Sequence, residues 1–157
     1  MDARAIIAAA RRGFGQLVRR PVLIVVLAAA AVRAWTVMHV PLVVTNDSVG
    51  YAQWASSILQ GDFPDLPIFR TPGYPIFLAG LWAAAGVGPQ VVLFAQHALG
   101  VATCTLVAAT AGRFGGPRAA LACGLLAALD LRLLGLECYL LTESLATFLA
   151  KTLGASP

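Results

Sequence analysis

Charge is almost absent from long stretches of this chain, and the stretch from Gln90 to Ala111 contains no acidic residue, lysine or arginine. Its length is close to the roughly 20 residues with which a helix crosses the hydrocarbon core of a bilayer. Over all 157 residues, 59% are hydrophobic and only 11% are charged, which would leave a soluble domain little to keep it in solution. The chain is therefore predicted to be an integral membrane protein with room for about four spans. The lack of a polar basic face argues against nucleic-acid binding.

Basic residues are concentrated ahead of the first apolar run, which extends from about Pro21 to Val40. Five arginines lie there: Arg4, Arg11, Arg12, Arg19 and Arg20. Because short cytoplasmic segments carry an excess of lysine and arginine, this cluster predicts a cytoplasmic N-terminus. We therefore divide the chain into a basic cytoplasmic segment, residues 1–20, and a transmembrane region, residues 21–157. The predicted location is the cell inner membrane or plasma membrane, which the chain crosses several times.

The segment from Thr45 to Phe69 is too polar to cross a bilayer and is predicted to form the first outer loop. Asn46 or Asp47 can cap a helix that continues to about Gln60, and Gly61 suits its end. Apolar residues recur at helical spacing along this segment. We therefore expect a helix that lies along the membrane surface, with Asp47 at its start.

Four further segments complete the expected all-α, polytopic bundle. They are a short interfacial or re-entrant helix (Tyr74–Val87), a span (Gln90–Ala111), a second span (Ala119 to about Leu136) and a last apolar stretch from near Thr142. In the favoured topology the short helix does not cross, so the basic loop Gly112–Arg118 is cytoplasmic, as the positive-inside rule requires. If the short helix did cross, that loop would lie outside and the residues after Thr142 inside.

Asp47 and Glu143 are the acidic residues that the favoured topology places together on the outer face. A carboxylate at a membrane edge costs free energy unless it is hydrated, paired or used. Two of them could bind a divalent cation through oxygen ligands, or one could act as general base towards a hydroxyl. The alternative is that each simply caps a helix, Glu143 as part of Thr142-Glu143.

Arg70 lies in a segment rich in proline and glycine, where a guanidinium could bind a phosphate through paired hydrogen bonds. The alternative is an interfacial anchor. Asp130 and Arg132 are expected within the span Ala119–Leu136, where they would pair with each other's neighbours, line a cavity or lie near the outer interface. Glu137 is expected at the interface, and His39 and His97 are isolated and assigned structural roles. The three cysteines are expected to be buried free thiols: Cys104, Cys123 and Cys138.

Two spaced motifs resemble a known family. The first combines Asp47-x3-Tyr51-x3-Ala55-x3-Leu59-x-Gly61 with Arg70-Thr71-Pro72-Gly73-Tyr74-Pro75, and the second is Leu140-Leu141-Thr142-Glu143-Ser144-Leu145. Together they resemble the first outer loop and the second acidic motif of polytopic glycosyltransferases of the C-type fold, the group of protein O-mannosyltransferases and aminoarabinose transferases. The resemblance covers most of the chain.

The resemblance implies transfer of a sugar from a polyprenyl-phosphate donor to a lipid, protein or glycan acceptor at the outer face. It implies that Asp47 orients or deprotonates the acceptor and that Glu143 is a second acid, with Asp47 and Glu143 as ligands of any Mg²⁺ or Mn²⁺. Tyr51, Arg70 and Tyr74 would bind the donor. Because relatives have many more spans, we expect this chain to be an N-terminal fragment that transfers no sugar alone. The alternative is a non-enzymatic membrane protein, such as a transporter subunit or assembly factor.

Overall fold

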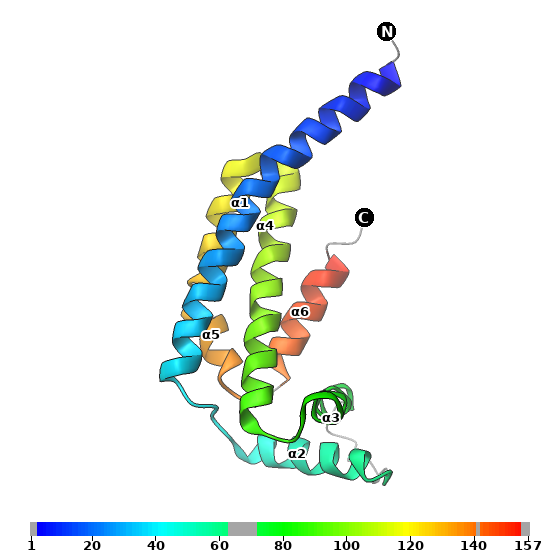
Figure 1. The fold of residues 1–157 in the computed structure, drawn as a ribbon, viewed down its shortest axis with the longest axis vertical. Helices are drawn as coiled ribbons and strands as arrows, with labels where there is room; N and C mark the ends of the chain where they lie inside the picture. Colours follow the sequence, from blue (N-terminus) through cyan, green and yellow to red (C-terminus); the bar gives the residue numbers. More distant parts are fainter. Residues whose placement is uncertain (1–2, 63–71, 141, 155–157) are drawn as a thin grey trace.

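The computed structural model describes residues 3–62, 72–140 and 142–154, with side chains described from residue 19 onward. Within these residues the chain forms helices and no strand, so the predicted all-α class is confirmed there. The helices are α1 (Ala3–His39), α2 (Asn46–Leu59), α3 (Gly73–Ala85), α4 (Pro89–Ala128), α5 (Leu131–Glu137) and α6 (Glu143–Gly154). The long helices α1 and α4 run side by side, and α2 and α3 lie at the end far from the N-terminus (Figure 1).

Two segments of the described chain are long and apolar enough to cross a membrane, Arg19–His39 in α1 and Pro89–Ala128 in α4. At 1.5 Å per residue, the 21 residues of the first measure about 32 Å, close to the thickness of a hydrocarbon core. α1 continues as a helix across the boundary expected after residue 20. The number of crossings and the cytoplasmic N-terminus stay predictions.

α4 is a pair of helical arms rather than a single rod. Gly116 has φ 74° and ψ −168°, and the chain reverses there, so that residues 89–115 run away from α2 and residues 117–128 return (Figure 1). A positive φ is readily adopted only by glycine, and Pro117 suits the first turn of the returning arm. The reversal falls within the predicted loop Gly112–Arg118, although helix occupies more of that segment than expected.

The returning arm is shorter than predicted. It ends at Ala128, and Asp130 begins a separate helix, because its Oδ1 accepts a hydrogen bond from the backbone N–H of Arg132 at 2.8 Å. The expected continuous span from Ala119 to Leu136 is therefore wrong. Asp130 and Arg132 are both exposed and follow the end of the returning arm, so they do not lie inside a continuous span.

α2 begins with a capping box formed by Thr45 and Ser48. The Thr45 hydroxyl accepts from the Ser48 backbone N–H, and the Ser48 hydroxyl accepts from the Thr45 backbone N–H at 2.9 Å. Thr45, and not Asn46 or Asp47 as predicted, is therefore the cap. Past the end of the helix, Gly61 has φ 79°, which agrees with its expected role as a stop.

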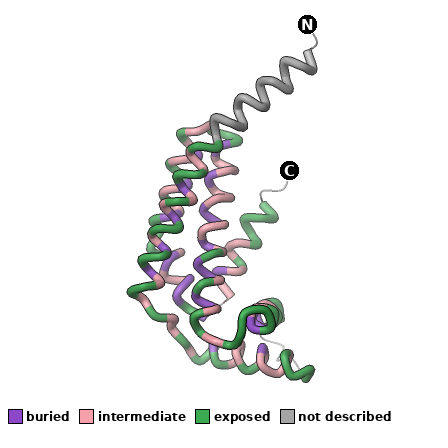
Figure 2. The backbone as a smooth tube through the Cα atoms, viewed as in Figure 1, coloured by how far each residue is buried: buried purple, intermediate pink, exposed green. Residues whose placement is uncertain are grey.

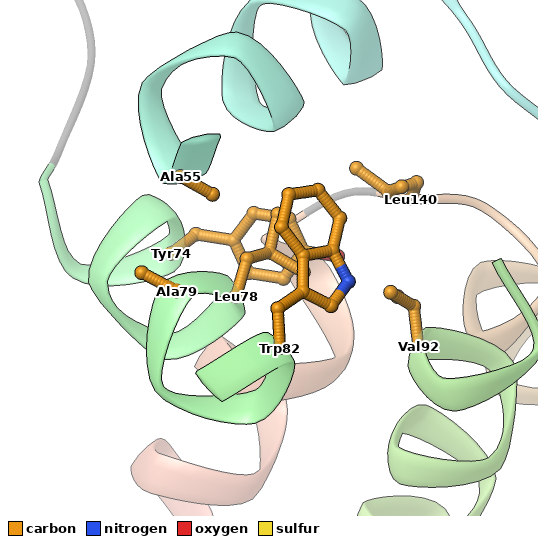
Figure 3. Packing of buried hydrophobic residues seen from close by; sticks show 7 residues of the cluster. All are labelled: Ala55, Tyr74, Leu78, Ala79, Trp82, Val92 and Leu140. Atoms are coloured by element: carbon orange, nitrogen blue, oxygen red, sulfur yellow. The ribbon is translucent and has the colours of Figure 1, made fainter. Parts of the chain in front are cut away.

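The core divides into two clusters. One lies between α1 and the two arms of α4, where buried residues line the facing surfaces (Figure 2): Val25, Ala29, Cys104, Ala108 and Ala128. The other joins α2, α3, the start of α4 and the segment between α5 and α6 (Figure 3): Ala55, Tyr74, Leu78, Ala79, Trp82, Val92 and Leu140. The second cluster fastens α2 and α3 to the same end of the long helices.

Candidate functional site

The two predicted acids lie at one end of the molecule. Asp47 is in the first turn of α2, and Glu143 is the first residue of α6, which starts beside the α2–α3 end and runs back along α4 (Figure 1). Asp47 is exposed, whereas Glu143 is half-buried. The reversal at Gly116 lies at the opposite end. The two acids therefore share one end of the fold, and the membrane face to which that end belongs stays a prediction.

Tyr74 connects the two acidic segments. Its ring is 2% exposed and meets the ring of Tyr51, one turn after Asp47, edge-on at 5.2 Å between centroids. Burial raises the pKa of the Tyr74 hydroxyl, and the negative charges of Glu143 and then Tyr51 raise it further. The predicted residues Tyr51, Tyr74 and Glu143 are therefore brought into one neighbourhood from α2, α3 and α6.

Two polar atoms of this neighbourhood are buried without a partner. Neither the Tyr74 hydroxyl nor Glu143 Oε2 has a hydrogen-bond partner among the described residues. An unpaired buried polar atom costs about 1–3 kcal/mol, and such atoms are retained where a ligand or water can bind them. The predicted donor-binding residue Arg70 lies outside the described residues.

A groove of about 530 Å³ opens at the same end, between α2 and the α3–α4 connection. Its wall is mainly apolar and includes Trp82, whose indole Nε1 is buried with no hydrogen-bond partner in the described part of the chain. Its polar side is formed by Gln53, Ser56 and Ser57 of α2, whereas Ser48, which also lines it, is fully buried. An amphipathic ligand would fit both surfaces.

No group of three or more histidine, cysteine, aspartate or glutamate side chains gathers as a metal site among the residues from 19 onward that are described. By themselves, Asp47 and Glu143 supply two carboxylates, one from α2 and one from α6. Mg²⁺ is commonly bound by one or two carboxylates, water and the phosphates of a substrate, so two acids are enough only together with a donor.

A second polar site, which was not predicted, lies deeper in the molecule. Glu137 Oε1 accepts from Arg33 Nη2 at 2.6 Å, and Glu137 Oε2 pairs with His97 Nδ1 at 2.7 Å. The exposed fractions are 2% for Arg33, 3% for Glu137 and 4% for His97. These three side chains form the Arg33–Glu137–His97 network, which ties α1, α4 and α5 together.

Gly100 makes room for this network. A methyl group there would overlap the Glu137 carboxylate and come within 2.5 Å of Arg33 Nε. Arg33 Nε and His97 Nε2 have no hydrogen-bond partner among the described residues. The network is thus packed closely on one side and still has two unused nitrogens.

The expectations for these residues need correction. Glu137 is not interfacial but buried, and His97 is not isolated, because the two are partners. Their positions lie 40 residues apart, and Glu137 lies 104 residues from Arg33, so no local pattern joins them. The available signal was that each is an ionisable residue in apolar surroundings and needs a partner.

Other sequence expectations fare unevenly. Cys104 and Cys138 are buried free thiols as predicted, but Cys123 is exposed. His39 is exposed and stacks on Trp35, with ring centroids 4.6 Å apart.

Residues 138–142 lead from α5 to α6, and we call them the α5–α6 connector. Hydrogen bonds join residues 138–140 to the loop before α2 and to α4. The N–H of Val43 donates to the carbonyl of Cys138 at 2.7 Å, and the N–H of Leu140 donates to the carbonyl of Val43 at 3.2 Å. Gln96 Nε2 donates to the carbonyl of Tyr139 at 2.7 Å. Val43 and Tyr139 thereby form a parallel bridge.

Comparison of the chain with models of protein families, with curated proteins and with solved structures found no match.

Proposed function

We propose that this chain forms the first outer loop and donor site of a multi-pass membrane glycosyltransferase. The enzyme transfers a sugar from a polyprenyl-phosphate carrier to an acceptor at the outer face. The observation that carries the proposal is the ring contact of Tyr51 with Tyr74, with Glu143 close enough for its charge to act on Tyr74, at the end where Asp47 is exposed. These are residues from both motifs that suggested the reaction.

The groove beside α2 supports a lipid-linked donor. Its apolar wall would accept the first part of a prenyl chain, and its polar side would face the phosphate and sugar. The Tyr74 hydroxyl is protonated at neutral pH, as tyrosine ordinarily is, and burial raises its pKa further, so it can donate a hydrogen bond to a phosphate oxygen. Arg70 is proposed to bind the same phosphate as a bidentate donor.

Asp47 is the proposed general base. It is exposed, so an acceptor hydroxyl can reach it, and loss of the hydroxyl proton to its carboxylate would accompany attack on the sugar carbon. The lipid phosphate leaves with the electrons of the broken bond. Glu143 orients the acceptor or, with Asp47 and the donor phosphate, binds Mg²⁺ or Mn²⁺.

The test replaces Asp47 by asparagine, which keeps the size of the side chain and removes its charge. Membranes from cells that express the full reading frame encoding this chain are supplied with polyprenyl-phosphate sugars and acceptors. Transfer by Asp47→Asn should fall about 10²–10⁴-fold, the usual contribution of a general base. Asp62→Asn, at an exposed acid just past the same helix, is the matched control and should keep the parental rate.

Two results contradict the proposal. Parental transfer by a well-inserted Asp47→Asn variant would remove Asp47 from the reaction. No transfer from any polyprenyl-phosphate sugar by the parent would favour the alternative, a non-enzymatic membrane protein.

A further inference from the structure

The acid that begins α6 is connected by a short segment to Glu137, the most buried carboxylate among the described residues. Glu137 is the last residue of α5, and Glu143 is the first residue of α6. Both carboxylate oxygens of Glu137 are engaged, one by Arg33 of α1 and the other by His97 of α4. The start of the α5–α6 connector is therefore fixed to two long helices that lie side by side.

Residues 138–140 of the connector are held by hydrogen bonds to two other segments. The backbone of Cys138 and Leu140 bonds to Val43, and the carbonyl of Tyr139 is bound by Gln96, the neighbour of His97 on α4. In α6, the hydroxyl of Ser144 donates to the carbonyl of Leu136 at 3.4 Å. Hydrogen bonds thus hold the chain both shortly before and directly after Glu143.

The parallel bridge also relates the two acids to each other. Asp47 follows Val43 by four residues, and Glu143 follows Tyr139 by four residues. Because Val43 and Tyr139 are paired in parallel, the two chains leave the bridge in the same direction, each towards the first turn of a helix. A shift of the connector would change the separation between Asp47 and Glu143.

We propose that the Arg33–Glu137–His97 network is a positioning device for Glu143: it fixes the connector and so sets the distance from α6 to α2. The catalytic consequence rests on the proposed glycosyl transfer. Arg33, His97 and Glu137 touch no substrate in this scheme and act through the connector. A displacement of about 1 Å in a reacting group can lower a rate about 10²-fold, so a buried network can control the reaction from a distance.

The variant that tests this is His97→Leu, because Glu137→Gln would leave Arg33 buried without a counter-charge and could prevent folding. His97→Asn is the matched control, since the asparagine amide nitrogen occupies nearly the place of histidine Nδ1 and can still donate to Glu137. Both are made in the full chain, in lipid nanodiscs, with Cys104, Cys123 and Cys138 replaced by alanine.

The readout is the distance between spin labels at the exposed positions Leu59 of α2 and Leu149 of α6, measured by double electron–electron resonance. We expect one narrow distribution for the parent and for His97→Asn, and a broadened, shifted distribution for His97→Leu. A His97→Leu distribution equal to that of the parent would overturn the proposal, whatever the activity.

The second measurement is the rate of sugar transfer by the protein expressed from the full reading frame. His97→Leu should lower kcat about 10²-fold with little change in the KM for the donor, and His97→Asn should recover most of it. A shifted distance with unchanged kcat would overturn the positioning role. If the parent itself transfers no sugar, the proposed reaction fails, while the spin-label distances still decide whether the network positions α6.

Discussion

Replacing Gly100 by alanine tests whether the Arg33–Glu137–His97 network is as closely packed as the structure describes. Gly100 lies inside a helical arm of α4, where alanine is normally the better residue. The added methyl group, however, would overlap the Glu137 carboxylate and crowd Arg33 Nε. The two effects have opposite signs, so the direction of the change is informative.

The magnitudes favour destabilisation. Alanine in place of glycine stabilises a helix by about 0.8–1.0 kcal/mol. Overpacking costs roughly 1–3 kcal/mol, so even the smallest overpacking cost is about as large as the gain in helix stability. Breaking a buried ion pair costs roughly 3–5 kcal/mol, and Glu137 cannot retreat without leaving Arg33 or His97. We expect a net loss of about 3 kcal/mol, which corresponds to a Tm lowered by about 6–12 °C.

Thermal unfolding can be followed with a fluorogenic maleimide, because Cys104 and Cys138 are buried until the protein unfolds. All variants carry Cys123→Ser, which removes the exposed thiol. Gly80→Ala is the matched control, since nothing lies within 4 Å of a methyl group there, and its Tm should equal or slightly exceed that of the parent. A Gly100→Ala Tm at or above the parental value would refute the packing described around Glu137.

Three further outcomes are expected. In a cysteine-free background, Asn46→Cys should react with an impermeant maleimide outside intact cells and Phe114→Cys only after permeabilisation; the reverse pattern would contradict the topology. The pKa of Tyr74 is raised above its ordinary value near 10, so the folded state retains this proton when the unfolded state has lost it. The free energy of unfolding should therefore fall as pH rises past about 10, and the fall should be smaller in Tyr74→Phe but unchanged in Tyr139→Phe. Gly116→Ala should cost about 1–3 kcal/mol, because φ 74° with ψ −168° is a conformation that essentially only glycine adopts, and the same Tm assay measures the loss.

Local features were predictable from the sequence. The end of α2 at Gly61, the short α3 and the reversal near Gly116 follow from glycine and proline, whose conformational preferences act within a few residues. The break before α5 depends on equally local chemistry, the capping of a helix by Asp130. It was missed because apolar residues continue on both sides of it.

Long-range features were not predictable. Thr142-Glu143 and Asp47 could be recognised as candidate acids, but Tyr74 comes under the influence of the Glu143 charge only because α3 packs against α2 and the connector. The Arg33–Glu137 pair joins positions 104 residues apart. The bridge between Val43 and Tyr139 consists of backbone hydrogen bonds, which leave no mark in the identity of the side chains.

The separation of Arg33 from Glu137 has a consequence for the order of synthesis. If α1 enters the membrane as it leaves the ribosome, Arg33 is inserted before its counter-ion exists. At about 5–20 residues per second, the 104 residues that follow Arg33, up to and including Glu137, take roughly 5–20 s to make. Arg33 lies six residues before the end of α1, about 9 Å along the axis, so its long side chain can reach towards the headgroups during that interval. During synthesis, α1 would therefore lie in the bilayer with an unpaired Arg33 charge, and this charge would be neutralised only when α5, which carries Glu137, has been made and has packed against α1.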